Sequence, residues 1–305
     1  MEASLAGLRT ALGARVREGE PLAAHTTLRV GGPAELFVEA KKILELVEFV
    51  RLARLHGVPS FVLGNGSNIL VRDGGMRGLV IENHCDDITL NVINSEKAIL
   101  SAESGAALPG VANRLARQGW SGLEWAIGVP GTLGGAVVGN AGAHGGAIAD
   151  NLVAVEILDA QGATRRLPKT ECAFEYRASR FKRSKSEIVL RAEFEMKRDD
   201  PAACVARMNE YTDHRRRTQP TDPSVGSMFK NPPGDFAGRL IEQARMKGAR
   251  VGKVEVSRAH ANFFVNLGGA TASQVLQLVE IVKSAVREKF GLELELEIEI
   301  VGEDT

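Results

Sequence analysis

Two glycine-rich segments contain the residues whose types and spacing best suit a chemical role. They are Gly64-Asn65-Gly66-Ser67-Asn68 and Gly128-Val129-Pro130-Gly131-Thr132-Leu133-Gly134-Gly135, the second continuing to Asn140, Ala141 and Gly142. Glycine readily adopts positive φ values, so successive backbone N–H groups can turn toward one anion. We expect the two segments to bind the diphosphate of a dinucleotide. Tight turns without a ligand are the alternative, because short glycine-rich patterns also arise by chance.

Two common phosphate-binding patterns are absent from the sequence. No Gly-x-Gly-x-x-Gly follows a strand with an acidic residue placed downstream, so a Rossmann dinucleotide site is not expected. Neither segment ends in Gly-Lys followed by Ser or Thr, which excludes a P-loop. Phosphate binding of another type is therefore expected.

The composition indicates a globular protein with small partners. Of 305 residues, 44% are hydrophobic and 25% charged, and basic and acidic residues number 38 each. A net charge of zero gives no field that would gather nucleic acid or anionic lipid. Cys85, Cys172 and Cys204 have the spacing of neither a disulfide framework nor a zinc site, so we expect no metal and a reducing compartment.

The first 20 residues predict an amphipathic helix and lack the features of a signal peptide. No apolar run approaches the roughly 18 residues that a membrane-spanning helix requires. We therefore expect a cytoplasmic protein without membrane insertion.

The spacing of apolar residues predicts the elements that must position the glycine-rich segments. Helices are expected over residues 43–55, 108–118, 202–217, 236–244 and 272–290. Strands are expected over residues 35–39, 61–63, 69–71, 79–82, 88–92, 99–103, 153–158, 188–196, 253–256 and 262–266, and residues 292–300 alternate Leu or Ile with Glu as a last strand does. The pattern breaks at Arg198 to Pro201, before a polar helix, and predicts two domains of mixed α and β structure.

Longer motifs carry a resemblance to a known family. The segment from Phe61 to Val71, with Asp73 and Gly78, closely resembles the first diphosphate loop of flavoproteins of the vanillyl-alcohol-oxidase type, and the second glycine-rich segment resembles theirs too. Within that group the chain is similar, over nearly its whole length, to the UDP-N-acetylenolpyruvoylglucosamine reductase family. The motifs behind this likeness are Tyr176-Arg177-Ala178-Ser179-Arg180-Phe181, Gly226-Ser227-Met228-Phe229-Lys230-Asn231-Pro232 and Glu295-Leu296-Glu297.

The resemblance implies a reaction, its cofactors and a fold. The family reduces the enolpyruvyl ether of UDP-N-acetylglucosamine to UDP-N-acetylmuramate for peptidoglycan, with non-covalent FAD and with NADPH as co-substrate. The implied fold is α+β: an N-terminal helix (residues 1–20), an FAD-binding domain of the vanillyl-alcohol-oxidase (PCMH) type with two α/β subdomains (21–198), and a smaller α+β substrate-binding domain (199–305). A monomer is expected. The implied FAD contacts are Gly64, Asn65, Gly66, Ser67, Asn68, Gly128, Pro130, Gly131, Thr132, Gly134, Gly135, Asn140, Ala141 and Gly142.

Three residues match the family's catalytic positions. Arg177 matches the arginine that offers a rigid donor fork to the substrate carboxylate and the developing enolate. Ser227 matches the proton donor to the carbanionic carbon, although a serine hydroxyl is a weak acid that needs help from its neighbours. Glu297 matches the glutamate that hydrogen-bonds the enol, with Glu295, one strand repeat away, as the alternative.

The substrate contacts and one departure from the family are also placed by the resemblance. Tyr176, Lys230 and Asn231 match substrate-binding positions. His144 stands where many relatives have Tyr after Asn-Ala-Gly-Ala, which puts an aromatic contact at that corner of the flavin site in question. The short stretch after Phe181 resembles the subgroup that lacks a tyrosine-bearing insertion.

Two other functions stay open at this point. An FAD-dependent oxidase of the same fold, acting on an alcohol or sugar, has no carbanion to protonate, so Arg177, Ser227 and Glu297 together argue against it. A nucleotide-binding protein without catalysis would use the glycine-rich segments only to hold its ligand. A yellow protein that NADPH bleaches anaerobically, and that the enolpyruvyl nucleotide reoxidises, indicates the reductase.

Overall fold

The computed structural model describes residues 2–304, and contacts within the chain divide it into two compact units. Met1 and Thr305 lie outside the described residues. The first unit contains the chain up to Arg15, Val38–Gly64 and Ile81–Arg215, and the second contains Val16–Phe37, Asn65–Val80 and the chain from Arg216 onward. Each unit is therefore assembled from stretches that are far apart in the sequence.

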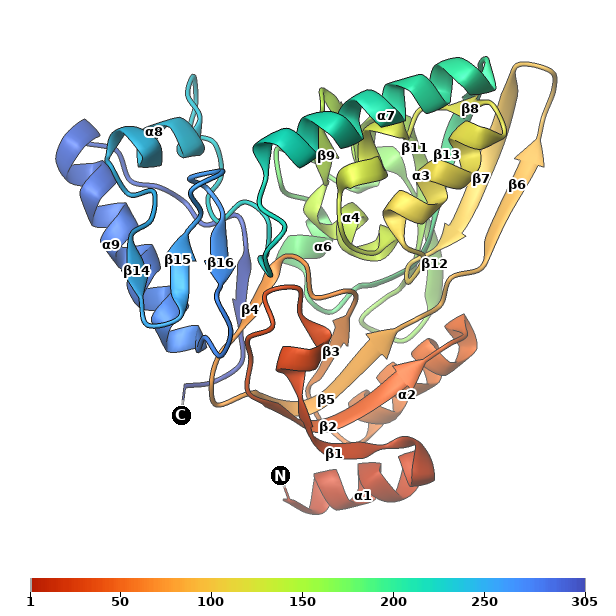
Figure 1. Ribbon diagram of the computed structural model, residues 1–305. Coiled ribbons are helices and arrows are strands. Elements are labelled where there is room, and N and C mark those ends of the chain that lie inside the picture. Colours follow the sequence, from red (N-terminus) through yellow and green to blue (C-terminus); the bar gives the residue numbers. More distant parts are fainter. Residues whose placement is uncertain (1, 305) are drawn as a thin grey trace. The chain divides into compact units, whose positions relative to one another are not determined.

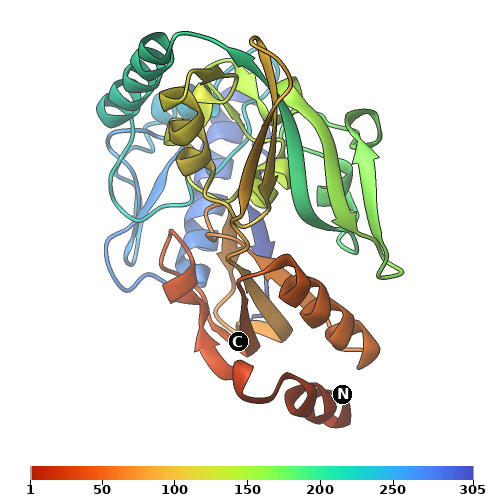
Figure 2. The ribbon, with the colours of Figure 1, turned by 90° about the vertical axis from the view of Figure 1, so that its right-hand side faces the viewer.

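The first unit is built on a large antiparallel sheet. Its strands have the order β12-β11-β13-β7-β6, and β8 pairs with the far end of β13. Figure 2 shows the long strands β11, β12 and β13, in green, lying side by side. The bounds are β6 Ile88–Val92, β7 Lys97–Glu103, β8 Trp120–Ser121, β11 Leu152–Leu158, β12 Thr164–Pro168 and β13 Ile188–Arg198.

Helices and short turns cover this sheet and complete its core. Buried side chains of β7, β11 and β13, such as Leu100, Val155 and Phe194, pack with Val111 of α3 and Val137 of α4. The helix α7 packs on α3, along which it runs in Figure 1. The remaining elements are α3 Leu108–Arg117, a 3-10 helix Glu124–Gly128, α4 Leu133–Gly139, β9 Gly142–Ala143, β10 Gly146–Ala147, α5 Ile148–Asn151, a 3-10 helix Lys169–Glu171, α6 Arg180–Arg183 and α7 Pro201–Thr218.

The N-terminal part of the chain contributes two helices and a further sheet. The sheet has the strand order β1-β2-β5-β3, with β1 antiparallel to β2. The bounds are α1 Glu2–Leu12, 3-10 helices Gly13–Arg15 and Leu22–His25, β1 Arg17–Pro21, β2 Pro33–Ala40, α2 Ile43–Leu55, β3 Ser60–Leu63 and β5 Met76–Asn83. The expected helix over the first 20 residues is thus too long. It ends at Leu12 because Gly13 has a φ of 60°, a left-handed conformation that commonly terminates helices.

The second unit combines two helices with a three-stranded antiparallel sheet. The helix α9 packs on the sheet β14-β15-β16, and α8 packs against α9, as Figure 1 shows. The helix α9 is strongly specified, since Thr271 caps the N–H of Gln274 and Gly291, with a φ of 67°, ends it. The bounds are α8 Ala237–Gln243, β14 Arg250–Val251, β15 Val254–Val256, β16 Phe264–Asn266 and α9 Ala272–Phe290.

The last segment of the chain is only partly a strand. Only β17, Glu299–Val301, is a strand, and it pairs in parallel with β4, Ile69–Val71. Earlier in the segment, Leu296 forms an isolated bridge with Phe229. The expected continuous strand over residues 292–300 is therefore wrong. The segment changes pairing partner along its length, so no single ladder covers it.

The other expected helices and strands are present, with ends shifted by a few residues. The helix α7 follows the boundary expected at Arg198 to Pro201, but its contacts as far as Arg215 group it with the first unit. The reason is that its buried side chains, Cys204 and Met208, pack on Ala116 of α3. In the part of the chain that the structure describes, no helix is long and apolar enough to cross a membrane.

Candidate active site

The second glycine-rich segment is held tightly inside the first unit. It leads into α4, whose first-turn N–H groups are taken by the protein itself: Leu133 donates to the carbonyl of Ala106 at 2.8 Å, and Gly134 to that of Ser104 at 2.8 Å. The N–H of Gly135 is capped by the Thr132 hydroxyl at 3.3 Å. These three amides therefore stabilise the loop, and donors to a ligand must come from elsewhere in the two segments.

Gly64, at the start of the first glycine-rich segment, lies against the second. A Cβ added at Gly64 would lie 2.5 Å from Oγ1 and 3.1 Å from Cγ2 of Thr132. Gly64 does not have a positive φ, so the backbone conformation does not require glycine there. Glycine is required because a side chain would collide with Thr132. The structure thus brings two residues together, one from each segment, that the sequence assigned to the same cofactor.

The rest of the first segment belongs to the second unit. Gly66 has a φ of 57°, and a Cβ there would lie 2.3 Å from the carbonyl oxygen of His25, so only glycine fits. Asn68 is tied to the last segment of the chain: its side-chain amide donates to the carbonyl of Glu297 at 3.3 Å, and its own carbonyl accepts from Glu299 at 3.0 Å. The segment is therefore connected directly to a predicted catalytic residue.

Arg177 is presented on a tight turn in the first unit. Glu175 and Ala178 exchange backbone hydrogen bonds of 3.0 and 3.2 Å, and Arg177, between them, has a φ of 56°. A left-handed conformation costs a non-glycine residue about 1–2 kcal/mol, so the surroundings must enforce it. Nη2 of Arg177 donates to the carbonyl of Gly142 at 2.9 Å, and the guanidinium lies 5.2 Å from the centre of the Tyr176 ring. The side chain of Tyr176 is 54% exposed.

Residues after Arg177 anchor this turn to the core. The hydroxyl of Ser179, which is fully buried, donates to the carbonyl of Val138 in α4 at 2.7 Å. Phe181 is buried in the core of the first unit. Arg180 forms a two-pronged ion pair with Glu187, with distances of 2.9 and 2.6 Å. Ser179, Arg180 and Phe181 thus fix the position of the turn that carries Arg177.

Two residues that the sequence assigned to the cofactor also position Arg177. Asn140, with a φ of 42°, ends α4 and donates from its side chain to the carbonyl of Glu175 at 2.9 Å, while its Oδ1 accepts from Ala149 at 3.1 Å. Gly142 supplies the carbonyl that accepts from Arg177. Sequence reasoning missed this support, and only the family spacing of the Asn-Ala-Gly motif and the Tyr-Arg motif could have suggested it.

Ser227 is placed in the second unit by a buried asparagine that the sequence did not single out for a role. Asn262 is 3% exposed, and its side chain hydrogen-bonds both backbone groups of Phe229. Oδ1 accepts from the Phe229 N–H at 3.0 Å, and Nδ2 donates to the Phe229 carbonyl at 2.8 Å. The Asn262 carbonyl also accepts from Met228 at 2.8 Å. Gly226, with a φ of 77°, turns the chain just before Ser227.

The segment after Ser227 lies beside the two candidate glutamates. Lys230 donates its N–H to the carbonyl of Glu295 at 2.8 Å, and Glu297 donates its N–H to the carbonyl of Met228 at 2.9 Å. The Glu295 side chain is 75% exposed and ion-paired with Nζ of Lys230 at 3.1 Å, whereas Glu297 is half-buried. Asn231, which the sequence assigned to substrate binding, accepts the N–H of Ala237 at the start of α8.

The predicted site residues therefore form two groups. The first unit contains Gly64, the second glycine-rich segment, Tyr176 and Arg177, and the second unit contains Asn65, Gly66, Ser67, Asn68, Ser227, Lys230, Asn231 and Glu297. Within each group the contacts above bring the residues together.

Comparisons with known proteins identify two matched regions and a family. Residues 34–168 match the model of an FAD binding domain, and residues 219–301 match that of the UDP-N-acetylenolpyruvoylglucosamine reductase C-terminal domain. The UDP-N-acetylenolpyruvoylglucosamine reductase of Rubrobacter xylanophilus is 47% identical over 284 residues, which cover 93% of this chain and 94% of the relative. The chain belongs to the UDP-N-acetylenolpyruvoylglucosamine reductase family.

Further relatives extend the match over both chains. The reductase of Chloroflexus aggregans is 42% identical over 299 residues, covering 96% of this chain and all of the relative. The crystal structure of the reductase from Thermus caldophilus has a TM-score of 0.78 and 38% sequence identity, covering 93% of this chain and 97% of that one. This chain is thus an FAD- and NADPH-dependent oxidoreductase of peptidoglycan precursor synthesis.

The glycine-rich segments of the reductase fit a flavin dinucleotide. Gly66 and Gly131 have φ values of 57° and 128°, which side-chain-bearing residues rarely adopt. The absence of side chains lets the backbone come close to a diphosphate. The chemistry of the two segments, with backbone donors, Ser67 and Asn68, therefore suits the FAD that the matched domain implies.

His144, where the sequence was expected to depart from the family, takes part in a stack of rings in the first unit. Its ring stacks on Tyr211 of α7, with centres 4.3 Å apart and planes at 15°, and His214 meets it edge-on at 5.6 Å. Burial lowers the pKa of His144, and electrostatic interactions with the nearby His214 and Arg215 lower it further. The histidine thus keeps an aromatic contact, with α7 as the partner.

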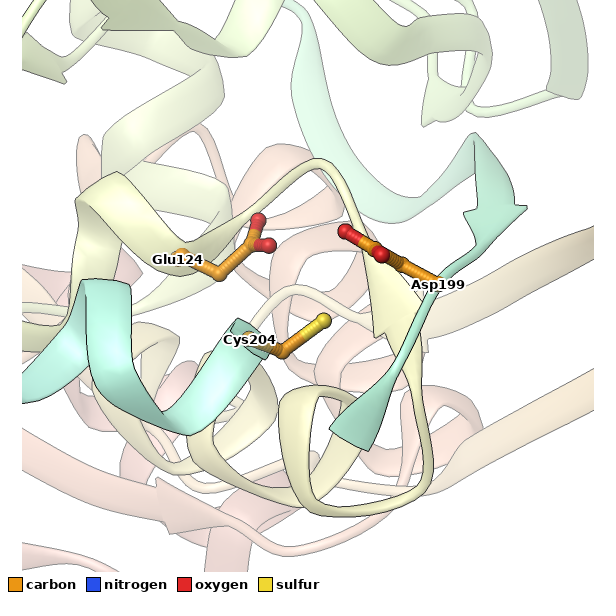
Figure 3. A group of neighbouring side chains, drawn as sticks. All are labelled: Glu124, Asp199 and Cys204. Atoms are coloured by element: carbon orange, nitrogen blue, oxygen red, sulfur yellow. The ribbon is translucent and has the colours of Figure 1, made fainter. Parts of the chain in front are cut away.

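A cluster of possible metal ligands in the first unit already contains a cation. Figure 3 shows Glu124, Asp199 and Cys204 directed toward one another. Nη2 of Arg207 lies 2.6 Å from Glu124, 2.6 Å from Asp199 and 3.3 Å from the Cys204 sulfur. Burial raises the pKa of the Cys204 thiol to about 11, which makes it a poor ligand. The cluster is an ion-pair network centred on Arg207.

Proposed function

We propose that the enzyme reduces the enolpyruvyl ether of UDP-N-acetylglucosamine to UDP-N-acetylmuramate, with Arg177, Ser227 and Glu297 as catalytic residues. Bound FAD would supply the hydride chemistry that connects NADPH with the enolpyruvyl group. The protein must then stabilise negative charge beside the substrate carboxylate and add one proton to the adjacent carbon. The assignment is supported by the family membership and by the way each of these residues is held within its own unit.

Arg177 is suited to hold the substrate carboxylate and the enolate. Its turn is fixed by Asn140 and Gly142 behind it and by the buried Ser179 after it, so the guanidinium is preorganised before substrate arrives. A planar fork of donors matches a carboxylate, and it becomes more favourable as the enolate develops. The exposed Tyr176 next to it offers an apolar face for the nucleotide substrate.

Ser227 is suited to deliver the proton. Among the described residues its hydroxyl has no hydrogen-bond partner, while the backbone on either side is held by Gly226 and Asn262. A half-buried hydroxyl on a fixed backbone is available to a substrate. The proposal rests mainly on this observation: the Ser227 hydroxyl has no hydrogen-bond partner among the described residues, while its backbone is held in place.

Glu297 is favoured over Glu295 as the carboxylate that assists protonation. The side chain of Glu295 is 75% exposed and paired with Lys230, so it is largely solvated. Glu297 is half-buried, and its backbone pairs with Met228, next to Ser227 in the sequence. Lys230 is suited to the substrate's phosphates, and Asn231, through its cap on α8, fixes the end of the same loop.

The first test separates the two half-reactions in anaerobic stopped-flow absorbance. Ser227→Ala should keep bleaching of the flavin by NADPH near the wild-type rate, because that step needs no proton from the serine. Reoxidation by the enolpyruvyl nucleotide should slow by at least about a hundredfold, the usual contribution of a general acid. Ser186→Ala, at an exposed serine, is the matched control and should change neither rate.

The outcomes discriminate between the candidate functions. Normal turnover by Ser227→Ala would show that the assigned proton donor is wrong. Flavin that is reoxidised by oxygen with an alcohol or sugar as donor, and not by the enolpyruvyl nucleotide, would favour the oxidase. A wild-type protein that binds no flavin after refolding with FAD would leave only a nucleotide-binding role.

We also propose that the enzyme acts as a cytoplasmic monomer with domains at residues 21–198 and 199–305 after the N-terminal segment. NADPH and UDP-linked sugars are cytoplasmic metabolites, which supports this location. The proposed substrate and cofactor sites lie within one chain, which supports the monomer. Light scattering of the purified protein tests the oligomeric state.

A further inference from the structure

One face of helix α7 ends in a residue unlike the rest of that face. Cys204, Met208, Tyr211 and Arg215 follow one another at intervals of three or four residues and so lie on the same side of the helix. Cys204 and Met208 are buried, and Tyr211 packs on the core of the first unit. The last position of this otherwise packed face is an arginine.

Arg215 lies against the beginning of the second glycine-rich segment. A Cβ added at Gly128 would lie 2.8 Å from Cδ of Arg215 and 3.7 Å from its Nε and Nη1. Gly128 does not have a positive φ, so its backbone does not require glycine. The missing side chain of Gly128 therefore makes room for Arg215, which brings a guanidinium to the edge of the second glycine-rich segment.

The guanidinium of Arg215 has no partner within the described chain. It forms no hydrogen bond or ion pair with another described residue, although it is half-buried. Burial lowers the pKa of Arg215, and no carboxylate acts in the opposite direction. Arginine nevertheless stays charged in proteins, so this site holds an uncompensated, partly desolvated cation with several unused donors.

Other ionisable side chains lie close to Arg215 in α7 without pairing with it. Arg216 and Arg217 follow it, Glu210 and Asp213 precede it, and neither carboxylate forms an ion pair with Arg215. The C-terminal end of α7 is favourable for a cation, but the last carbonyls of a helix compensate only part of a buried charge. By contrast, Arg180, Arg191 and Arg207 of the same unit are all paired with carboxylates. Arg215 differs from them in facing a loop that we expect to bind a nucleotide.

We propose that Arg215 is a binding residue for the diphosphate of a nucleotide at the second glycine-rich segment. The inference rests on the proposed function, which requires nucleotides that carry this group: FAD, the UDP-linked sugar and NADPH. Guanidinium and phosphate oxygens form two parallel charge-assisted hydrogen bonds. Such a ligand supplies both the charge and the acceptors that Arg215 lacks, and the absent side chain of Gly128 leaves room for the guanidinium beside the loop.

Three variants of the full-length enzyme test the proposal. Arg215→Met removes the donors, Arg215→Lys keeps the charge but not the fork, and Gly128→Ala keeps Arg215 but displaces it. Arg165→Met, at an exposed position of β12, is the control for loss of one positive charge. For each protein we would measure the FAD dissociation constant from flavin fluorescence, the KM values for both other nucleotides, and the melting temperature of the apoenzyme.

The expected result is a loss of affinity for one diphosphate without loss of fold. Arg215→Met should weaken binding by about ten- to a hundredfold, the range for a hydrogen bond to a charged group, and Gly128→Ala by a similar factor. Arg215→Lys should lie between these and wild type. A rise in the FAD dissociation constant assigns Arg215 to the cofactor, and a rise only in a KM assigns it to the sugar nucleotide or NADPH.

Several outcomes would overturn the proposal. If the FAD affinity and both KM values of Arg215→Met change no more than those of Arg165→Met, Arg215 binds no diphosphate. An apoenzyme melting temperature that falls in all three variants, with unchanged affinities, would show that Arg215 only packs α7 on the loop. Failure of the proposed function is seen separately, because the wild-type enzyme would then show no enolpyruvyl reduction before any variant is compared.

Discussion

Replacing Asn262 by Ala should loosen the segment that carries Ser227. The Asn262 side chain satisfies both backbone groups of Phe229, at 3.0 and 2.8 Å, in a fully packed environment where Phe229 is 0% exposed. Alanine would leave one N–H and one carbonyl without partners. Each unpaired buried group costs about 1–3 kcal/mol, so we expect a local destabilisation of about 2–6 kcal/mol.

Hydrogen exchange measured by mass spectrometry can detect this effect at the right place. Both tryptophans, Trp120 and Trp125, lie in the first unit, so their fluorescence does not report on this segment. A peptide containing Phe229 should exchange at least about thirtyfold faster, since 1.4 kcal/mol corresponds to a factor of ten. Because Ser227 would lose its fixed position, kcat should also fall by about tenfold or more.

The control for this prediction is Asn113→Ala on the surface of α3. Among the described residues, the Asn113 side chain bonds to Arg117 alone, four residues further along the same helix, and its loss should leave exchange near Phe229 unchanged. The reasoning would be refuted if Asn262→Ala kept wild-type exchange at Phe229 while folding normally. Water or a shifted neighbour would then satisfy the Phe229 backbone as well as Asn262 does.

Two further predictions concern the first unit. Gly64→Ala should weaken FAD binding by about tenfold, because its Cβ would lie 2.5 Å from Thr132 Oγ1; Gly139→Ala, with nothing within 4 Å, should not, and isothermal titration would show the difference. Burial raises the pKa of Glu124, but hydrogen bonds led by that from Arg207 outweigh it and hold the pKa below 4.5. This carboxylate therefore adds stability above pH 4.5 that is lost as pH falls through the lowered pKa. In urea unfolding, Glu124→Gln should have a lower free energy of unfolding than wild type at pH 7. Between pH 5 and pH 3 its free energy of unfolding should fall by less than that of wild type. An equal fall in the two proteins over that pH range would contradict the prediction.

Local patterns in the sequence were sufficient for much of the fold. The helix α9 is found over the expected residues because its apolar spacing, its Thr271 cap and its terminal Gly291 all lie within one stretch of chain. The predicted N-terminal helix extended beyond the real one, which ends at Leu12, because the turn at Gly13 has no strong signal beyond a single glycine. The helix α4 was missed, since a run of glycines has low helix propensity and only packing of Leu133 and Val137 makes it helical.

By itself, the sequence determined the family, the two glycine-rich segments and the identity of Arg177, Ser227 and Glu297 as candidates. These are short patterns of residue type and spacing, which can be read without knowing what they contact. The tertiary structure decided how the candidates are held: Asn140 and Gly142 behind Arg177, Asn262 beside the Ser227 segment, and Arg215 against Gly128. These pairs are separated by tens of residues, and a hydrogen bond or a close approach between such residues depends on how the chain packs, which no local pattern records.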